Sequence, residues 1–138
     1  MTPRKILVID DSNLIHKLFA VIFPKTVLVH AMDGREALQR LAEHADVELM
    51  FLDINMPAMN GIELLRQVKA DAVLAQIPVI IISTEGKEAD TIRGLQAGAA
   101  AYVRKPFRNE EVVEIARRVL RPRESPPAPG ETASAPTV

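Results

Sequence analysis

The sequence contains no cysteine. This absence excludes disulfide bonds, thiolate nucleophiles and metal sites with cysteine ligands. Long hydrophobic runs are also absent, and none approaches the roughly 20 residues that a membrane-spanning helix needs. The basic N-terminus is followed by only a short apolar run, which ends at Asp10 and Asp11, so no secretion signal is recognised. We therefore expect a cytoplasmic protein without a membrane anchor.

Neither sign of charge dominates the sequence. The chain has 17 Lys and Arg residues against 18 Asp and Glu residues, which gives a formal net charge of −1. Proteins that bind nucleic acid or anionic membranes in general rely on clustered basic charge, so we expect neither partner. A length of 138 residues allows one domain and not two ordinary ones, and the 48% of hydrophobic residues is typical of a globular protein.

Large apolar side chains are almost missing from residues 122–138, where Val138 is the single example. Five of the ten prolines lie in this segment. Such a composition cannot bury enough apolar surface to offset the entropy lost on ordering. We predict one domain over residues 1–121, followed by a disordered tail or linker, rich in proline and alanine, over residues 122–138.

Before that segment, short apolar runs alternate with longer amphipathic stretches. The runs, which predict buried strands, cover residues 5–9, 26–30, 48–52, 77–82 and 101–103. Between and after them, apolar residues recur at helical spacing. The positions that predict the five helices are Ile15, Leu18, Phe19 and Ile22; Ala37, Leu38, Leu41 and Ala45; Ile62, Leu65 and Val68; Ala89, Ile92 and Leu95; and Val112, Ile115, Ala116 and Val119. The alternation predicts an α/β fold, with a parallel sheet between two layers of helices and right-handed crossovers.

Polar residues that can bind ions or take part in a reaction follow four of the expected strands. In chain order they are Asp10 and Asp11, then Asp53, then Ser83 and Thr84, and finally Lys105 with Pro106. Each alone has an ordinary interpretation, as a helix cap or a solvated side chain. In a parallel sheet, however, the carboxyl ends of all strands lie at one edge, which is where ligands bind. The sequence therefore predicts three carboxylates, a hydroxyl and an ammonium group together at that edge.

Three carboxylates in one pocket repel one another, and two like charges 4 Å apart cost about 4 kcal/mol at an effective dielectric constant of 20. A hard divalent cation such as Mg²⁺ removes this cost, because it prefers oxygen ligands. A carboxylate beside the ion can attack a phosphoryl group and form an acyl phosphate. The ion and an ammonium group then neutralise the phosphoryl oxygens. The pattern therefore favours phosphoryl transfer with Mg²⁺ or Mn²⁺.

Four stretches of the sequence carry a family resemblance: ILVIDDS at 6–12, LDINMP at 52–57, PVIIIST at 78–84 and YVRKPF at 102–107. Together they resemble the receiver domain of two-component response regulators, and in particular its single-domain chemotaxis type. The resemblance covers residues 4–120. It implies a flavodoxin-like (βα)5 fold, a three-layer sandwich whose five-stranded parallel sheet has the strand order 2-1-3-4-5.

The resemblance also implies the roles of the acidic residues. Asp53 matches the residue that accepts the phosphoryl group. Asp11 and the backbone carbonyl of Asn55 match direct ligands of Mg²⁺, and Asp10 matches a ligand that acts through water. Asp53 itself completes this metal site.

The remaining site residues match the family's phosphate-binding and switch positions. Lys105 matches the lysine that pairs with the phosphate, and its peptide bond to Pro106 is expected to be cis. Ser83 matches the switch hydroxyl. Thr84 occupies a position where the family often has a smaller residue, and its neighbouring hydroxyl is an alternative to that of Ser83. Tyr102 matches the aromatic switch residue.

The function implied is that of a phosphoacceptor, not of an enzyme, with weak intrinsic self-phosphorylation and self-dephosphorylation. The expected donor is a sensor histidine kinase or a phosphotransfer protein. The expected output is a change in the protein-binding surface formed by the fourth helix, fifth strand and fifth helix. Exposed residues expected to contact a protein target there are Lys87, Asp90, Arg93, Arg104 and Asn109.

Three alternatives remain open from the residues. An aspartate-nucleophile phosphatase has a second Asp two residues after the nucleophile, but here that residue is Asn55. A flavodoxin-like cofactor-binding protein needs a phosphate-binding loop after the first strand, where Asp10 and Asp11 would repel phosphate. A pseudo-receiver that serves as a scaffold would not need the intact acidic set. A phosphorylation assay distinguishes a receiver domain from these three alternatives.

Overall fold

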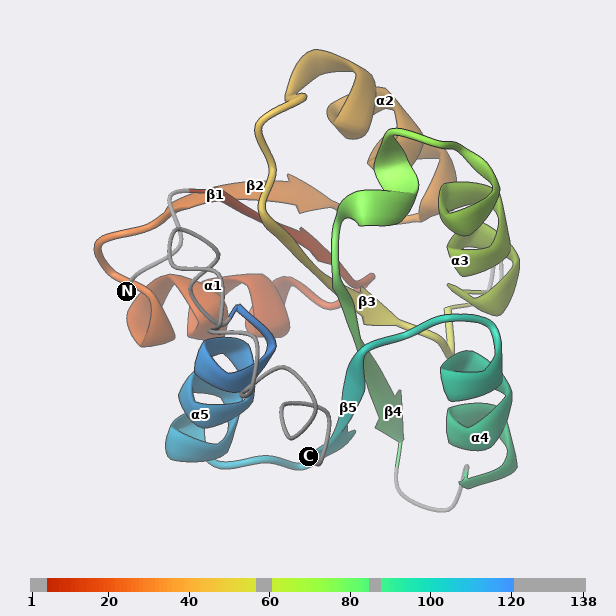
Figure 1. Ribbon diagram of the computed structural model, residues 1–138. Helices are drawn as coiled ribbons and strands as arrows, with labels where there is room; N and C mark the ends of the chain where they lie inside the picture. Colours follow the sequence, from red (N-terminus) through yellow and green to blue (C-terminus); the bar gives the residue numbers. More distant parts are fainter. Residues whose placement is uncertain (1–4, 57–60, 85–87, 121–138) are drawn as a thin grey trace, which may run out of the picture.

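The computed structural model describes residues 5–56, 61–84 and 88–120 (Figure 1). Within these residues, five strands alternate with five α-helices, and one short 3-10 helix precedes the fourth strand. The elements are β1 (Lys5–Ile9), α1 (Asn13–Ile22), β2 (Val27–Ala31), α2 (Gly34–Glu43), β3 (Leu49–Asp53), α3 (Gly61–Ala70), η1 (Leu74–Gln76), β4 (Val79–Thr84), α4 (Glu88–Gln96), β5 (Ala101–Lys105) and α5 (Asn109–Val119). The predicted tail at 122–138 lies outside the described residues, so the proposed domain boundary stays a prediction.

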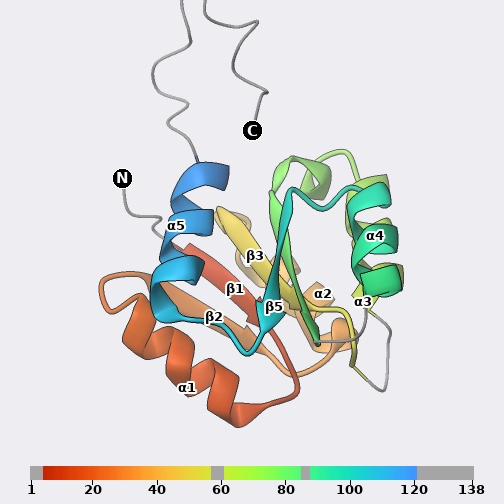
Figure 2. The ribbon, with the colours of Figure 1, turned by 90° about the horizontal axis from the view of Figure 1, so that it is seen from below.

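All strand pairs in the sheet are parallel, and the strand order is β2-β1-β3-β4-β5. Helices α1 and α5 cover one face of the sheet, and α2, α3 and α4 cover the other (Figures 1 and 2). The expected flavodoxin-like three-layer fold is therefore confirmed. Because the strands are parallel, their carboxyl ends meet at one edge, where the predicted site residues lie.

The core consists of two apolar layers, one on each face of the sheet. Alternate side chains of the central strands enter opposite layers, since the side-chain period of a strand is two residues. Leu7 and Leu52 pack in the layer beneath α2 and α3, whereas Val8 and Phe51 pack in the layer beneath α1 and α5. All four are completely buried. Burying a Leu or Phe side chain stabilises the fold by about 1.5–3 kcal/mol, so these layers hold the strand ends in place.

Two helices that begin at the functional edge are capped by side chains. Ser12 is the N-cap of α1, and its hydroxyl accepts a hydrogen bond from the Ile15 N–H at 3.4 Å. Asp33 is the N-cap of α2 and accepts from the Glu36 N–H at 2.8 Å. Caps of this kind satisfy amide groups that the first helical turn leaves unpaired. The turns after β1 and β2 are therefore fixed at the edge where the acidic residues lie.

Helix α4 forms where expected, but the side of it that faces the sheet is different. The apolar positions that predicted this helix point outward: Ile92 is 55% exposed and Leu95 is 38% exposed. The buried residues of α4 are Thr91 and Gly94. Gly94 lets α4 pack closely on the sheet, since an added Cβ would lie 2.6 Å from Cδ1 of Ile81 and that side chain would have to move. The apolar spacing of α4 therefore describes an exposed surface and not the core.

Strand β4 lies two residues later than expected. The sequence predicted a strand over 77–82, but the ladder to β5 continues through the pairs Ser83–Arg104 and Thr84–Lys105. Ser83 and Thr84 are thus the last residues of a strand and do not follow it. The backbone of the sheet consequently fixes the positions of Ser83 and Lys105.

Candidate functional site

The carboxyl ends of β1 and β3 bring three carboxylates together. Asp10 and Asp11 follow β1, Asp53 ends β3, and these two strands are neighbours in the sheet. One carboxylate oxygen from each residue lies within 4.8 Å of the other two. Asp10 and Asp53 are buried, with 0% and 3% of their surface exposed, whereas Asp11 is exposed. We call Asp10, Asp11 and Asp53 the acidic cluster.

Backbone amides orient two carboxylates of the acidic cluster. Asp10 Oδ1 accepts a hydrogen bond from the Ser12 N–H at 2.9 Å, and Asp53 Oδ1 accepts one from the Asn55 N–H at 2.9 Å. The remaining oxygens face Lys105, whose Nζ lies 3.1 Å from Asp10 Oδ2 and 3.6 Å from Asp53 Oδ2. The peptide bond between Lys105 and Pro106 is cis, which is the isomer that the resemblance implies.

The acidic cluster has the donor set that a hard divalent cation needs. Asp10 Oδ2 is buried without a hydrogen bond, although the Lys105 ammonium is within ion-pair distance. One ammonium group is not enough to neutralise three carboxylates. Mg²⁺ binds carboxylate and carbonyl oxygens, which are the groups found at this edge. The residues therefore fit such an ion.

Burial dominates the electrostatics of Asp53. Removal from water raises the pKa of the Asp53 carboxyl above its ordinary value, and the nearby Asp10 and Asp11 carboxylates raise it further. The Asn55 N–H and the Lys105 ammonium lower this pKa, but they do not compensate fully. Asp53 is therefore a carboxylate whose charge is costly, and any added positive charge at the cluster stabilises it.

The side chain of Asn55 links the loop after β3 to two other elements. Its Oδ1 accepts a hydrogen bond from the Thr84 N–H at 3.0 Å, at the end of β4. Its Nδ2 donates to Asp90 Oδ2 at 3.3 Å, in the first turn of α4. The sequence placed Asp90 among exposed contacts for a partner. The expected exposure of Asp90 is wrong, because its side chain is only partly exposed and forms hydrogen bonds with Asn55 and Arg93.

The predicted switch residues occupy different environments. Ser83 is 2% exposed and follows Ile82, the residue that pairs with Asp53 across the sheet. Thr84 is exposed. Tyr102 pairs with Ile81 further down the sheet, and 40% of its surface is exposed. The structure thus brings Ser83 close to the acidic cluster, whereas Tyr102 lies on the surface beside α4 and α5.

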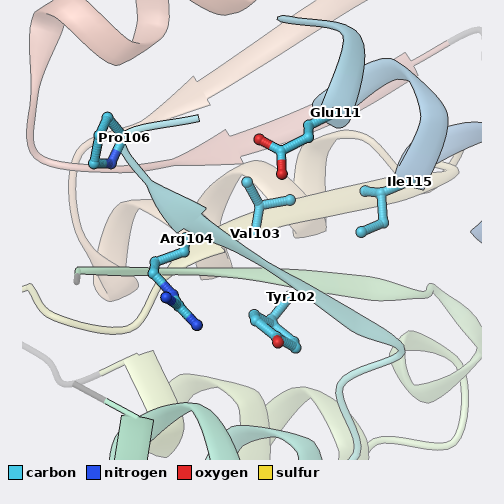
Figure 3. A pocket seen from close by; sticks show the side chains of 6 residues that line it. All are labelled: Tyr102, Val103, Arg104, Pro106, Glu111 and Ile115. Carbon is cyan, nitrogen blue, oxygen red and sulfur yellow. The ribbon is translucent and has the colours of Figure 1, made fainter. Parts of the chain in front are cut away.

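A hollow of about 450 Å³ lies beside β5 and is separate from the acidic cluster. Figure 3 shows Tyr102 and Arg104 leaving β5 on one side, and Val103 leaving it on the side of α5. The residues that line the hollow are Tyr102, Val103, Arg104, Pro106, Glu111 and Ile115 (Figure 3). Of the other expected partner contacts, Arg93, Arg104 and Asn109 are exposed, and Lys87 lies outside the described residues.

Sequence reasoning gave no role to His16, which the structure places directly under the acidic cluster. Its Nε2 lies 2.7 Å from the Asp10 carbonyl oxygen, and its Nδ1 lies 2.7 Å from Nδ1 of His30. A carbonyl oxygen only accepts, so His16 donates from Nε2. Burial, and then the neighbouring His16, lower the pKa of His30. The spacing of His16 from Ser12 indicates a helical residue, but nothing in the sequence shows that it meets Asp10.

Known proteins share this fold and this sequence pattern. The sequence profile of the response regulator receiver domain matches residues 6–117. Chemotaxis protein CheY1 of Helicobacter pylori is 35% identical over an alignment of 119 positions, which covers 84% of this chain and 96% of that protein. The CheY homolog of Campylobacter jejuni is 34% identical over 119 residues, covering 84% of this chain and 92% of that protein. The solved structure of Vibrio cholerae chemotaxis protein CheY4 has a TM-score of 0.78 and 29% identity, and covers 85% of this chain and 98% of that one.

The chain therefore belongs to the family of response regulator receiver domains, and it is similar to the CheY proteins of chemotaxis. Receiver domains are signalling phosphoacceptors that bind Mg²⁺ at an acidic pocket and interact with histidine kinases and downstream targets. Of the four hypotheses drawn from the sequence, the receiver hypothesis is the one that the comparisons support. In the part of the chain that the structure describes, no helix has the length and apolar character to cross a bilayer.

Proposed function

We propose that Asp53 is the residue of this chain that accepts the phosphoryl group. The observation that carries the proposal is its position at the end of the central strand β3, buried, with its free oxygen facing Lys105 Nζ at 3.6 Å. Asp10 accepts a hydrogen bond from the turn at Ser12 and pairs with the same lysine, and Asp11 is exposed. Asp53 is the member of the acidic cluster at the position that matches the family's phosphoacceptor, and Lys105 is in place to meet the incoming charge.

Asp10, Asp11, Asp53 and the backbone carbonyl of Asn55 would hold Mg²⁺ or Mn²⁺ in this proposal. When bound, the ion supplies positive charge that offsets the negative charge of the carboxylates and of the phosphoryl oxygens. The buried Oδ2 of Asp10 supports this assignment, because it accepts no hydrogen bond and the Lys105 ammonium is its ion-pair partner and also that of Asp53.

The proposed transfer is a single displacement at phosphorus. One oxygen of Asp53 forms a bond to phosphorus while the P–N bond of a phosphohistidine on the donor breaks, and the imidazole leaves with the bonding electrons and takes up a proton. Lys105 pairs with the transferred oxygens, and the Ser83 hydroxyl donates a hydrogen bond to one of them. The same geometry allows slow self-phosphorylation from a small acyl phosphate and slow loss of the group to water.

We place the output surface on α4, β5 and α5. Ile92, Leu95 and Tyr102 expose apolar surface there, and Tyr102 also lines the hollow beside β5, together with Ile115 of α5 (Figure 3). Movement of Ser83 toward the phosphoryl group would vacate space beneath α4, and Tyr102 could then rotate inward. A local change of charge would thus bias a two-state surface. A protein target that binds this surface is the expected partner, and a histidine kinase or phosphotransfer protein in the cytoplasm is the expected donor.

Incubation with acetyl phosphate and Mg²⁺ tests the proposal. We expect intact mass spectrometry to show one added phosphoryl group, which should not form when the metal is chelated before acetyl phosphate is added. The group should be absent from Asp53→Asn, because an amide cannot form the acyl phosphate. A variant with an acidic residue changed elsewhere, Glu114→Gln on the exposed face of α5, is the control and should be labelled like the wild type. Equal labelling of Asp53→Asn would show that another residue accepts the group.

A further inference from the structure

The side chain of Asn55 is fixed at both of its polar atoms. Its Oδ1 accepts from the Thr84 N–H and its Nδ2 donates to Asp90, so the two partners together determine the orientation of the amide. The Ile54 N–H donates to the carbonyl of Ile82 at the end of the β3–β4 ladder. Backbone groups two residues apart on a strand point to the same side, so the Thr84 N–H points beyond the end of β3, toward the phosphoacceptor loop.

Asp90 accepts a hydrogen bond from Asn55 and belongs to α4, a helix with few buried residues. The buried residues of α4 are Thr91 and Gly94, and its apolar side chains Ile92 and Leu95 face outward. Asp90 is in the first turn of α4, with 23% of its side chain exposed. One of its oxygens accepts from Asn55 and the other pairs with Arg93. A continuous polar link thus runs from α4 through Asn55 to the end of β4.

We propose that Asp90 opposes phosphorylation: through Asn55 it ties α4 to the end of β4 in the unphosphorylated state and stabilises that state. This inference rests on the function proposed above, because it concerns a group added at Asp53. Asp90 does not touch the reacting atoms. It acts on Asn55, whose backbone N–H donates to Asp53 and whose side chain occupies the Thr84 N–H.

The link belongs to the unphosphorylated state for two physical reasons. A phosphoryl group on Asp53 brings charged oxygens to the same edge of the sheet, and a charged oxygen is a stronger acceptor for the Thr84 N–H than the neutral amide oxygen of Asn55. The new charge also repels the Asp90 carboxylate. Phosphorylation therefore competes with the link. Phosphorylation shifts the protein toward the state without the link only by the difference between its interaction free energies with the two states. The Asp90→Ala substitution removes the link in advance, so phosphorylation no longer has to break it.

Beryllofluoride, a mimic of the phosphoryl group, provides the test when titrated with Mg²⁺ present. We expect Asp90→Ala to bind it about two- to fivefold more tightly than the wild type, which corresponds to the net value of one hydrogen bond. Asp90→Asn keeps an acceptor oxygen for Asn55 and should lie closer to the wild type. Glu88→Ala is the matched control, since it removes one negative charge from the exposed face of the same helical turn. It should shift the affinity less than Asp90→Ala does.

A second measurement needs neither phosphate mimic nor metal. In the NMR spectrum of the free protein, the side-chain amide signals of Asn55 should move in Asp90→Ala and stay in place in Glu88→Ala. Unchanged Asn55 signals together with wild-type affinity in Asp90→Ala would overturn the role of Asp90. Failure of the wild type to bind beryllofluoride would instead count against the proposed phosphoacceptor, and the amide signals would still decide whether Asp90 holds Asn55.

Discussion

Asp53 is buried and is also expected to carry a negative charge, and these two requirements conflict. Burial and the neighbouring carboxylates raise its pKa, whereas the Asn55 N–H and Lys105 lower it. Without added positive charge, the ionised form destabilises the folded state at neutral pH. The charge that Asp53 needs to accept a phosphoryl group thus lowers the stability of the fold. A substitution that removes this charge should abolish phosphorylation and increase stability.

We expect Asp53→Asn to be more stable than the wild type at pH 7 in the absence of metal. Removal of the unfavourable charge should raise the thermal midpoint, and each gain of about 1 kcal/mol corresponds to about 3–6 °C in a domain of this size. Because the folded-state pKa of Asp53 is raised, the folded protein binds the proton more tightly than the unfolded chain does. The wild type therefore loses stability from this group as the pH rises from the ordinary Asp value through the raised one.

The difference in midpoint between Asp53→Asn and the wild type should consequently shrink on acidification through the same range. Thermal unfolding at a series of pH values, followed by circular dichroism, measures it. Asp46→Asn is a suitable control, because Asp46 is exposed at the opposite end of the sheet and its pKa is lowered, chiefly by its hydrogen bond from Lys5. A gain for Asp53→Asn that does not change with pH would mean that charge burial is not its cause.

At this scale, the sequence could predict residues whose place follows from the ends of strands. Asp10, Asp53 and Lys105 meet because their strands are parallel and end at the same edge of the sheet, and the structure gives the distances. The polar contacts of Asp90 and His16 could not be predicted. Each depends on how a helix is rotated and placed against the sheet, and no spacing in the sequence records that.

Among the elements, α3 begins directly against the backbone of the proposed phosphoacceptor, through Gly61 at its start. An added Cβ at Gly61 would lie 2.5 Å from the Ile54 Cα and 2.6 Å from the Asp53 carbonyl oxygen. Both are backbone atoms, so no side-chain rotation can relieve the overlap. The close approach of the start of α3 to the backbone of Asp53 and Ile54 therefore requires glycine at position 61.

We expect Gly61→Ala to lower the free energy of unfolding by about 2–4 kcal/mol, as for other substitutions that force overlap in a packed core. Because the displaced atoms belong to Asp53 and Ile54, labelling by acetyl phosphate should fall as well. Urea denaturation and the mass-spectrometric assay measure the two effects.

Gly94→Ala is the matched control for Gly61→Ala. Its Cβ would meet Cδ1 of Ile81 at 2.6 Å, which is the end of a side chain that can rotate, and alanine favours the helix by about 1 kcal/mol over glycine. The net cost should therefore be smaller than at Gly61. Equal destabilisation by the two substitutions would show that backbone contact at Gly61 is not the decisive feature.

The positions of the elements were largely predictable from apolar spacing, and the errors have physical causes. The central strands are apolar throughout because both of their faces are covered, and this signal is strong. Strand β4 was placed early because Ile77 continues the apolar run, although the ladder begins at Val79. For α4, the apolar stripe of Ile92 and Leu95 was real but lies outside, since spacing alone does not distinguish a core from a binding surface.

For the whole molecule, the order of the strands was not contained in the apolar pattern. Burial in the structure does distinguish a central strand from the edge strands: β3 is buried at every position, whereas β2 and β5 combine buried, partly buried and exposed residues. The apolar pattern does not say on which side of β1 each strand pairs. That information came from the family resemblance, and the structure confirms it.

We predict that residues 122–138 are dispensable for folding. A chain that ends at Arg121 keeps both apolar layers of the sheet, so its thermal midpoint should stay within about 3 °C of that of the full chain, equivalent to less than about 1 kcal/mol. A chain that ends at Ile115 is the contrast, because it loses Ala116, a buried residue of α5, together with Val119 and Leu120, which pack against the same layer. It should unfold at a much lower temperature. A large drop already at Arg121 would mean that the last residues pack on the domain.

Both ends of the described fold lie on the side opposite to the acidic cluster. Strand β1 begins there, and α5 runs back along the sheet to finish there (Figures 1 and 2). The local contacts at that pole, such as the ion pair of Lys5 with Asp46 at 3.0 Å, share no residue with the site. A fluorescent reporter or an effector fused next to either end of the described fold would therefore lie on the side away from the acidic cluster. It would leave the acidic cluster accessible to a phosphoryl donor.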